Sequence, residues 1–443
     1  MQEIIEPRIL KGFRDSLPEP EIKRKKIFAD LENTFSSFGF VPIDTPVLEY
    51  TEVLLGKGGG ETDKQVYNFK DNGGRDVAMR YDLTVPFARF VAANKNSLYF
   101  PFKRFHIAKV WRGENTQRGR YREFYQCDFD IVGADSPSAD LEILLLIKKS
   151  FETIGISDIK IHISNRGILN KFLEIHRLGN KSVEILRTVD KLAKIGEEKV
   201  RDLLEETAGN SSTSRILEFI KPETDFEKTL SKLESLCNGK NSETERLKVI
   251  YNALKENNCE NYFILDPAIT RGLDYYTGLV FETFLTGRES IGSVCSGGRY
   301  NNLASLYTKE ELPGVGASIG VDRLLAALDE GSPDSIKQLQ CECIIFNMDE
   351  NLTGLMHKTA DEVRKHGISC EVYPDSKKLN RQFLFAEKKN IPAGIIIGEE
   401  EKESGTITVK DLLKRENHEK IEISTGIEKI LSIVEKWRIN GTA

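Results

Sequence analysis

The sequence has no long apolar run. Nowhere in its 443 residues do about 18 or more apolar residues follow one another, so no membrane-spanning helix is expected. Residues 1–11 also lack the apolar core of a secretory signal peptide, and they are not the Arg- and Ser-rich kind of segment that targets organelles. Together these absences predict a cytoplasmic protein that does not associate with a membrane.

Cysteine pairs with metal-binding spacing are absent as well. The seven cysteines are scattered, without a CxxC pair or a Cys/His cluster at zinc spacing. Only Cys341 and Cys343 lie close together, on a predicted strand where their side chains point the same way. We therefore expect reduced thiols and no metal site formed by the protein itself.

A strong positive charge and the common nucleotide-binding motifs are also missing. The formal net charge is −6, so binding of RNA would need a local basic surface on an acidic body. The glycine-rich motifs GxGxxG and GxxxxGK[ST] do not occur in the context that their phosphate-binding function requires. A dinucleotide-binding or P-loop site is therefore not expected.

What is present indicates several domains. The length predicts roughly two to four of them, and 30% charged with 39% hydrophobic residues is typical of a soluble globular protein. Residues 1–165 and 262–330 have the mixed helix and strand patterns of one α/β domain. Between them, residues 166–261 carry apolar side chains at helical spacing, which predicts a helical insertion. Residues 335–443 alternate strand-like and helix-like segments, which predicts a separate small α/β domain with a mostly parallel sheet.

The longest strand signal lies between residues 102 and 130. Residues 102–114 alternate basic or polar with apolar side chains, which predicts a strand with one cationic face and Arg112 near its end. The turn-rich loop 115–120 leads into a second alternating strand over residues 121–130. A fixed guanidinium such as that of Arg112 can bridge two anions in a planar fork, as a reaction between a carboxylate and a phosphate requires.

Other blocks combine glycines with polar side chains. Residues 271–282 read Arg-Gly-Leu-Asp-Tyr-Tyr-Thr-Gly-Leu-Val-Phe-Glu, which can form a polar pocket floor with one fixed cation. Residues 296–300 (Ser-Gly-Gly-Arg-Tyr) and residues 314–325, which begin Gly-Val-Gly-Ala-Ser, contain glycines that let a strand pass close to a ligand. Residues 80–90, with Pro86 in the first turn of a predicted helix, can point polar groups from the helix start into the same pocket.

These blocks occur in the order found in histidyl-tRNA synthetases, and the resemblance extends from residue 8 to about residue 437. The segment 22–46 resembles motif 1 of the class II aminoacyl-tRNA synthetases, a dimer-interface element. Residues 102–130 resemble their motif 2, and residues 314–325 their motif 3. The resemblance implies an α/β fold: a catalytic domain with an antiparallel sheet flanked by helices, the helical insertion, and a C-terminal α/β anticodon-binding domain.

The resemblance also implies the reaction. L-histidine is activated with ATP to histidyl-adenylate and pyrophosphate, and histidine is then transferred to the 3′ end of tRNA(His). Mg²⁺ is expected to arrive with ATP, held mainly by the phosphates. The implied partners are tRNA(His), L-histidine, ATP and a second copy of the chain in a homodimer.

By the same resemblance, Arg112 and Arg271 are the catalytic residues. Arg112 would hold the α-phosphate of ATP and the amino-acid carboxylate, and Arg271 would meet the charge that builds on the α-phosphate. Arg323 would lie over the adenine opposite Phe124, as a cation–π partner, and Glu114 would accept a hydrogen bond from the adenine edge.

The expected histidine-binding residues are Asp82, Thr84, Gln126, Asp130, Tyr275, Tyr276 and Tyr300. Asp82 and Gln126 would bind the ammonium group, while Asp130 and Tyr276 would hold the imidazole ring. Gln126 and Asp130 lie on the same face of one strand because side chains alternate along it. A pocket that pairs both ring nitrogens is expected to reject apolar isosteres by about 10⁴ or more.

Several of these assignments have alternatives. Asp82 can be a plain N-cap of the helix that follows it. Arg118 and Arg120 can contact backbone phosphates of the tRNA acceptor end, or belong to a solvated hairpin tip. The helical insertion can be a clamp over the tRNA acceptor arm or a structural decoration.

Two other functions compete with charging of tRNA. A regulatory subunit that binds histidine without catalysis usually lacks the catalytic arginine and the C-terminal domain, whereas Arg271 and residues 335–443 are present here. A glycine, threonine or proline enzyme of the same class should lack the Tyr275-Tyr276 pair and the block 297–300. The block 80–89 resembles the eukaryotic and archaeal form of the family, which predicts a variant of that type.

Overall fold

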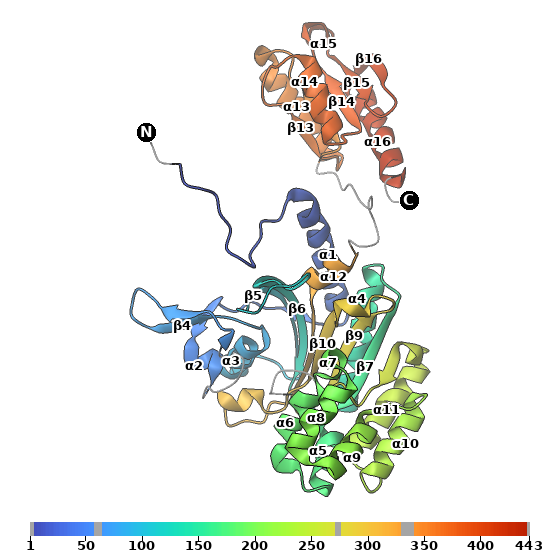
Figure 1. Cartoon of the computed structure of the whole chain (residues 1–443). Helices are drawn as coiled ribbons and strands as arrows, with labels where there is room; N and C mark the ends of the chain where they lie inside the picture. The colour runs from blue at the N-terminus through green and yellow to red at the C-terminus, as the bar shows by residue number, and fades with distance from the viewer. Residues whose placement is uncertain (1–3, 57–63, 271–275, 329–340, 441–443) are drawn as a thin grey trace. The chain divides into compact units, whose positions relative to one another are not determined.

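The computed structural model describes residues 4–56, 64–270, 276–328 and 341–440 (Figure 1). The chain folds into two compact units. The first unit consists of the residues up to Ser16 together with 24–331, and the second of residues 17–23 together with 332–443. Arg271 and Tyr275 lie outside the described residues.

The described part of the first unit is built on an eight-stranded mixed sheet. From one edge to the other its strands are β1 (Val41–Pro42), β5 (Phe102–Trp111), β6 (Glu123–Val132), β11 (Gly314–Ile319), β10 (Cys295–Arg299), β9 (Leu279–Leu285), β7 (Ile159–Asn165) and β8 (Phe263–Leu265). The outer pairs β1–β5 and β7–β8 are parallel, and the pairs between them are antiparallel.

The two faces of this sheet have different environments. On one face, Phe105, Phe129 and Ile131 pack into the hydrophobic core with α1 (Pro18–Ser37) and α4 (Pro137–Thr153). The rings of Phe35 and Phe129 lie 4.8 Å apart, in a tilted arrangement. The opposite face of β5 and β6 carries charged and polar side chains, so the core and the polar surface of the hairpin are separated by the sheet itself.

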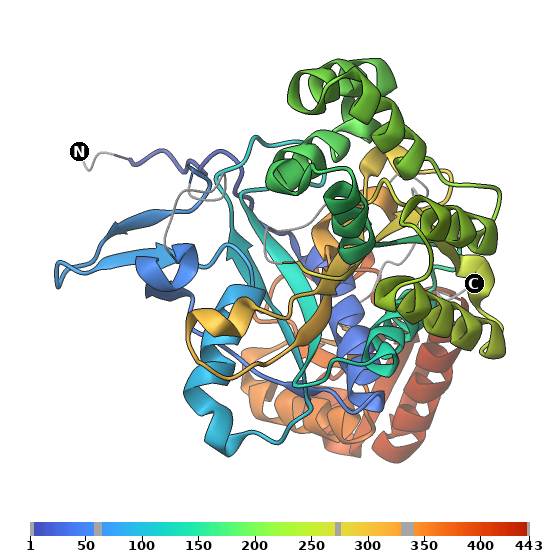
Figure 2. The ribbon, with the colours of Figure 1, turned by 90° about the horizontal axis from the view of Figure 1, so that it is seen from below.

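Residues 166–256 form a group of helices at one side of the first unit, seen in Figures 1 and 2. They are α5 (Arg166–Ile175), α6 (Ser182–Val189), α7 (Leu192–Ile195), α8 (Glu197–Ala208), α9 (Asn210–Ile220), α10 (Phe226–Leu236) and α11 (Ser242–Glu256). Ile185 and Val189, which stand at helical spacing in the sequence, are buried and belong to the same hydrophobic cluster as the sheet. The helices therefore share the core of the first unit.

A small antiparallel sheet completes the described part of this unit. It contains β2 (Leu48–Tyr50), β4 (Asp76–Met79) and β3 (Asn68–Lys70), next to α2 (Thr51–Leu55) and α3 (Thr84–Asn94). Apolar residues of α3, among them Val85, Phe87 and Ala88, pack with Val132 and Tyr300 in a second hydrophobic cluster. This packing sets the start of α3 beside the polar face of the large sheet.

The second unit contains a five-stranded sheet within its described residues. The strand order is β13 (Cys370–Val372), β12 (Cys343–Phe346), β14 (Ala393–Ile396), β15 (Thr406–Asp411) and β16 (Glu416–Glu422). Helices α13 (Thr353–Lys365), α14 (Leu379–Lys388), α15 (Glu399–Ser404) and α16 (Ile423–Asn440) complete it. The first three strands are parallel, but β14, β15 and β16 pair antiparallel. The expectation of a mostly parallel sheet is therefore wrong for this half, because the short turn between β15 and β16 can join only antiparallel neighbours.

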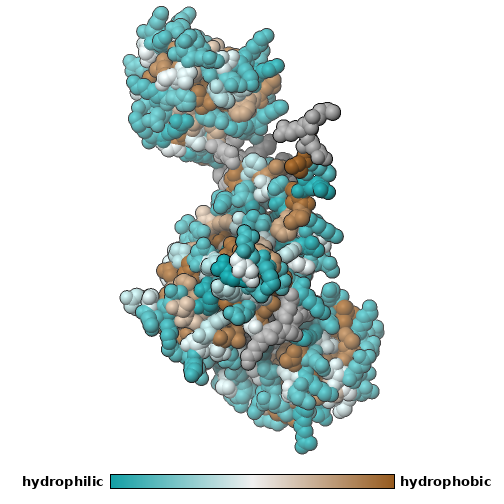
Figure 3. All heavy atoms as spheres, turned by 90° about the vertical axis from the view of Figure 1, so that its left-hand side faces the viewer, coloured by the Kyte–Doolittle hydropathy of each residue, from teal (hydrophilic) through white to brown (hydrophobic). Residues whose placement is uncertain are grey.

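On the face shown in Figure 3, hydrophobic side chains form patches between hydrophilic ones. Within the described ranges, no helix is both long and apolar enough to cross a membrane. All seven cysteines are buried and unbridged.

Candidate active site

The polar face of the β5–β6 hairpin is the centre of the site. Its register places Arg104 opposite Asp130, His106 opposite Asp128, and Ala108 opposite Gln126. The four titratable side chains of these pairs are all buried: Arg104, His106, Asp128 and Asp130. A buried charge is costly unless it is paired, so these residues must satisfy one another or a ligand.

Asp130 forms an ion pair with one side chain and accepts a hydrogen bond from another. The Arg104 Nη2 atom lies 2.7 Å from Asp130 Oδ2, and the Tyr300 hydroxyl donates to Asp130 Oδ1 at 2.6 Å. The guanidinium of Arg104 also stacks over the ring of Phe87, 4.2 Å from its centroid. Burial raises the pKa of Asp130, while Arg104 and the Tyr300 hydroxyl oppose that rise. Asp130 is therefore held in one orientation, as an acceptor for a ligand donor must be.

Asp128 and His106 lie beside this pair, and burial shifts the pKa of each towards its uncharged form. Burial, opposed by Arg104 and increased by Asp130, raises the pKa of Asp128 to about 7. Burial and the positive charge of Arg104 lower the pKa of His106 to about 3, so its ring is uncharged at neutral pH. At neutral pH the His106 ring therefore adds no charge to this face, and Asp128 is close to the midpoint of its titration.

Gln126 presents an acceptor to the site. Its Nε2 atom donates to Ser318 Oγ at 2.8 Å, which fixes the amide orientation. Gln126 Oε1 is buried and accepts no hydrogen bond from the residues that the structure describes. A buried acceptor without a donor is costly, so this oxygen is suited to receive a donor from a ligand.

Asp82 adds a third buried carboxylate. Its Oδ1 atom accepts from the Val85 amide at 3.1 Å in the first turn of α3, whose N-cap residue is Leu83. Thr84 is the first residue of α3 and is half-buried. Asp82 is close enough to Asp128 to raise its pKa. Among the described residues, the three carboxylates of Asp82, Asp128 and Asp130 outnumber the nearby cations Arg104 and Arg80, and this balance favours a ligand with a positive charge or several N–H donors.

Glycines on β10 and β11 leave the space that the side chains of Asp130, Tyr276 and Tyr300 occupy. A Cβ atom on Gly316 would overlap the Asp130 carboxylate, and one on Gly314 would overlap the Tyr300 ring. A Cβ on Gly298 would lie 2.9 Å from Tyr276 Cδ1. The glycines of the two blocks thus let Asp130, Tyr276 and Tyr300 pack directly on the sheet.

Tyr276 stands at the wall of the same pocket. Burial first, and then Asp130 and Asp128, raise the pKa of Tyr276, so its hydroxyl stays protonated. The Tyr276 carbonyl accepts from Arg166 Nη1 at 3.0 Å, and Arg166 Nη2 donates to the Thr270 carbonyl at 2.9 Å. Arg166 therefore links Thr270 and Tyr276, the residues that flank 271–275 in the chain.

A second group of predicted residues meets at the end of β5. Arg112 Nε donates to the Tyr81 carbonyl at 2.8 Å, and the Arg112 guanidinium lies 5.2 Å from the centroid of the Phe124 ring. Glu114 Oε1 lies 3.9 Å from Arg112 Nη1, and its other oxygen lies 3.9 Å from Arg120 Nη1. Arg112, Glu114 and Phe124 are thus brought together, as a shared ligand would require.

The loop after β5 packs on α12 (Val321–Leu328). A Cβ on Gly119 would lie 3.3 Å from Arg323 Cα, and Arg118 Nη2 donates to the Ala326 carbonyl at 3.4 Å. Arg323 itself donates through Nη1 to the Ser293 carbonyl. The loop therefore sets Arg118 beside the helix that carries Arg323, while Arg120 lies near Glu114.

The sequence prediction missed Arg104, His106, Asp128 and Ser318. Three of them could have been found, because the alternation of β5 and β6 puts Arg104 and His106 on one face and Asp128 between Gln126 and Asp130. Ser318 needed the register of β6 with β11, in which it stands opposite Asp128.

This architecture defines a class of protein. A largely antiparallel sheet carries an arginine and an aromatic side chain on a long hairpin, and a glycine-rich strand leads into a helix with a second arginine. These are the motif 2 and motif 3 elements of class II aminoacyl-tRNA synthetases.

The comparisons with known proteins agree. A family model described as histidyl-tRNA synthetase matches residues 12–324, and one described as anticodon binding domain matches residues 341–433. The histidine–tRNA ligase of Treponema denticola is 50% identical over 97% of this chain and 99% of its own length. That of Rhodopirellula baltica is 46% identical over 94% and 96%. The crystal structure of histidyl-tRNA synthetase from Nostoc sp. PCC 7120 matches with a TM-score of 0.82 at 30% identity, and covers 97% of this chain and 100% of that one.

The chain belongs to the histidyl-tRNA synthetase family. The predicted function, a histidine–tRNA ligase, and the predicted class II fold are confirmed. The expectation of a eukaryotic or archaeal variant is wrong, because these relatives are bacterial. In the structure Tyr81, Leu83 and Phe87 of the block on which this expectation rested are buried, so the block has a packing role in this fold.

Proposed function

We propose that the polar face of β5, β6 and β11 binds L-histidine and that Arg112 and Arg271 act on ATP. The chain then forms histidyl-adenylate and pyrophosphate and transfers histidine to the 3′ end of tRNA(His). The observation that carries this proposal is the buried carboxylate of Asp130, oriented by Arg104 and Tyr300 beside the unsatisfied acceptor Gln126 Oε1.

Histidine fits this pocket group by group. Asp130 accepts from one imidazole N–H and so selects the tautomer, while Tyr276, whose hydroxyl stays protonated, holds the ring from the other side. The α-ammonium group is bound by Asp82 and Gln126 Oε1, with Thr84 near them. Tyr275 and Tyr300 complete the pocket.

Activation joins two anions. A carboxylate oxygen of histidine attacks the α-phosphorus of ATP, an O–P bond forms, and the bond to the pyrophosphate group breaks. Arg112 bridges the carboxylate and the α-phosphate, which lowers their repulsion before attack. Arg271 stabilises the charge that develops on the α-phosphate.

The nucleotide is held at the end of β5. The adenine stacks on Phe124 and lies under Arg323, and Glu114 accepts a hydrogen bond from its edge. Mg²⁺ arrives with ATP and is bound mainly by the phosphates. No residue of this chain is assigned as its ligand.

The tRNA is held at both of its ends. The anticodon-binding domain matched over residues 341–433 takes the anticodon. Arg118 and Arg120 contact backbone phosphates of the acceptor end. We further propose that the chain acts in the cytoplasm as a homodimer.

Pyrophosphate exchange with a panel of amino acids tests this function. Exchange that depends on histidine alone is expected, followed by charging of tRNA(His). Arg271→Ala should lose roughly 3–4 kcal/mol of transition-state stabilisation and still bind histidine. A folded protein that binds histidine but exchanges with no amino acid would instead support the regulatory role.

A further inference from the structure

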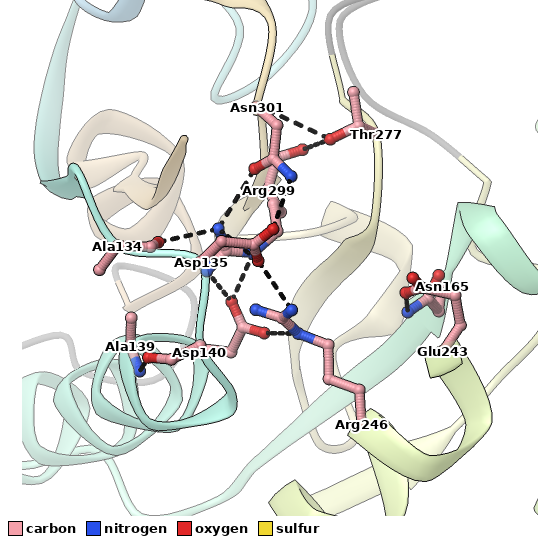
Figure 4. Close-up of polar contacts among 11 residues, drawn as sticks. Ala134, Asp135, Ala139, Asp140, Asn165, Glu243, Arg246, Thr277, Arg299 and Asn301 are labelled. Atoms are coloured by element: carbon pink, nitrogen blue, oxygen red, sulfur yellow. Dashed lines mark hydrogen bonds and ion pairs between the residues drawn. The ribbon is translucent and has the colours of Figure 1, made fainter. Parts of the chain in front are cut away.

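Asp140 joins two arginines that come from distant parts of the first unit (Figure 4). It lies on α4 and its side chain is 0% exposed. Arg299, at the end of β10, donates to Asp140 Oδ1 through Nε at 2.9 Å and through Nη2 at 2.6 Å. Arg246, on α11, donates through Nε to Asp140 Oδ2 at 2.6 Å.

A second carboxylate closes the group. Asp135 Oδ1 lies 2.7 Å from Arg246 Nη1 and 3.3 Å from Arg299 Nη1. The same Arg299 nitrogen donates to the Ala134 carbonyl at 3.1 Å and to Asn301 Oδ1 at 3.2 Å. Two guanidinium groups thus meet two carboxylates, with their charges balanced. We call Asp135, Asp140, Arg246 and Arg299 the Asp140 bridge.

The energetics of such a bridge favour a positioning role. Apolar residues of similar volume often stabilise a fold as well as a buried ion pair does. What the bridge supplies is orientation, since each guanidinium fork is fixed on two sides at once. Asp140 therefore links the position of α11 to that of β10.

At one end the bridge reaches the histidine pocket. Arg299 directly precedes Tyr300, whose hydroxyl donates to Asp130 at 2.6 Å. The Arg299 carbonyl accepts from the Thr277 amide at 2.7 Å, and Thr277 directly follows Tyr276. The Thr277 hydroxyl in turn accepts from the Asn301 amide at 3.2 Å. Arg299 therefore fixes the backbone beside Tyr276 and Tyr300, the two described tyrosines of the pocket wall.

At the other end the bridge reaches the helices of residues 166–256. Arg246 lies on α11, the last of them, and touches none of the proposed ligand residues through its described contacts. The same helix is tied to the end of β7, at the N-cap of α5, by a hydrogen bond of 2.7 Å from Asn165 Nδ2 to Glu243 Oε2 (Figure 4). α11 is therefore anchored at the point where it meets the catalytic sheet.

We infer that Arg246 is a positioning residue for histidine: through Asp140 it holds Arg299, and through Arg299 it holds Tyr276 and Tyr300 against the substrate. The inference rests on the proposed assignment of this pocket to histidine. It gives the helical region a role in amino-acid binding before any tRNA is present.

Arg246→Met tests the inference in histidine-dependent pyrophosphate exchange. The KM for histidine should rise about tenfold, as expected for a residue within a coupling network, while kcat and the KM for ATP stay within about twofold. Arg246→Lys keeps the charge but cannot reach both carboxylates in one fork, so it should fold and show a smaller rise. Arg201→Met removes an exposed pair with Glu197 on α8 and should change nothing.

The double variant Arg246→Met, Tyr300→Phe distinguishes positioning of the pocket wall from a general loss of rigidity in the fold. If Arg246 acts through the pocket wall, Arg246→Met should add less than about twofold to the KM for histidine in the Tyr300→Phe background. A full tenfold addition there, an unchanged KM in the single variant, or a fall in kcat alone would each overturn the inference. Wild-type protein without histidine-dependent exchange would overturn the proposed function itself, which keeps the two failures distinct.

Discussion

Gly316 shows how a single hydrogen atom in place of a side chain determines the pocket. A Cβ at this position would overlap the Asp130 carboxylate and lie 2.9 Å from the Phe129 carbonyl. The backbone cannot move without breaking the ladder between β6 and β11, so the carboxylate must turn away. It would then lose both Arg104 and the Tyr300 hydroxyl.

Gly316→Ala should therefore weaken histidine binding by roughly two orders of magnitude or more, because breaking a buried charge pair costs about 3–5 kcal/mol. Titration calorimetry with histidine alone measures this. Gly320→Ala, in the same glycine-rich block, is the matched control, since its Cβ would meet nothing closer than the Val294 carbonyl at 3.7 Å. Equal affinity in both variants would show that Asp130 does not contact histidine.

Asp128 gives the site a pH-dependent stability. Its pKa is about 7 in the folded protein, against 3.8 as the ordinary value, so the folded state binds more protons than the unfolded chain between these two limits. The contribution of Asp128 to the unfolding free energy therefore falls as pH rises from about 4 to about 7 and stays level above that. Asp128→Asn removes this dependence.

Urea unfolding of both proteins at several pH values measures the effect. Relative to Asp128→Asn, the wild type should lose stability steadily across this window. Parallel curves would mean that Arg104 keeps Asp128 ionised in the folded state, and that burial is the weaker influence.

At the scale of elements, local periodicity was enough for the β5–β6 hairpin. The alternation over residues 102–114 and 121–130 predicted both strands, which the structure places at Phe102–Trp111 and Glu123–Val132. It also put Gln126 and Asp130 on one face. It could not say that Arg104 is buried opposite Asp130, because burial depends on what covers that face.

Contacts between distant elements carried no local signal. Arg246 and Asp140 are 106 residues apart, and Arg299 and Asp140 are 159 residues apart. Each reads in the sequence as an ordinary surface charge. The same limit applies to β15 and β16, whose pairing depends on a turn and on the neighbouring strand β14. Sequence patterns thus predicted the local geometry of strands and helices. They did not predict the pairing between distant residues that completes the site.

At the scale of the whole molecule, exposed apolar residues predict where a second copy of the chain would bind in the proposed homodimer. Val41 on β1 is 47% exposed, and Leu48 and Tyr50 on β2 are 44% and 51% exposed. Among the strands that the structure describes, β1 is also an edge of the large sheet and pairs with β5 alone. Exposed apolar side chains on edge strands are typical of an interface, and Val41 lies within, and Leu48 and Tyr50 shortly after, the segment 22–46 that resembles motif 1.

The dimer is testable by sedimentation at micromolar concentration. One chain has a mass of 50.1 kDa, so the wild type should sediment as a species of twice that mass. The double variant Leu48→Lys, Tyr50→Lys should shift it towards the single chain, because two charges would be buried without partners at the interface. Val249→Lys is the control, since Val249 on α11 is 53% exposed and lies apart from this segment in the sequence. A single 50.1 kDa species for the wild type would exclude the homodimer, whereas dissociation by Val249→Lys alone would move the interface to the helical region.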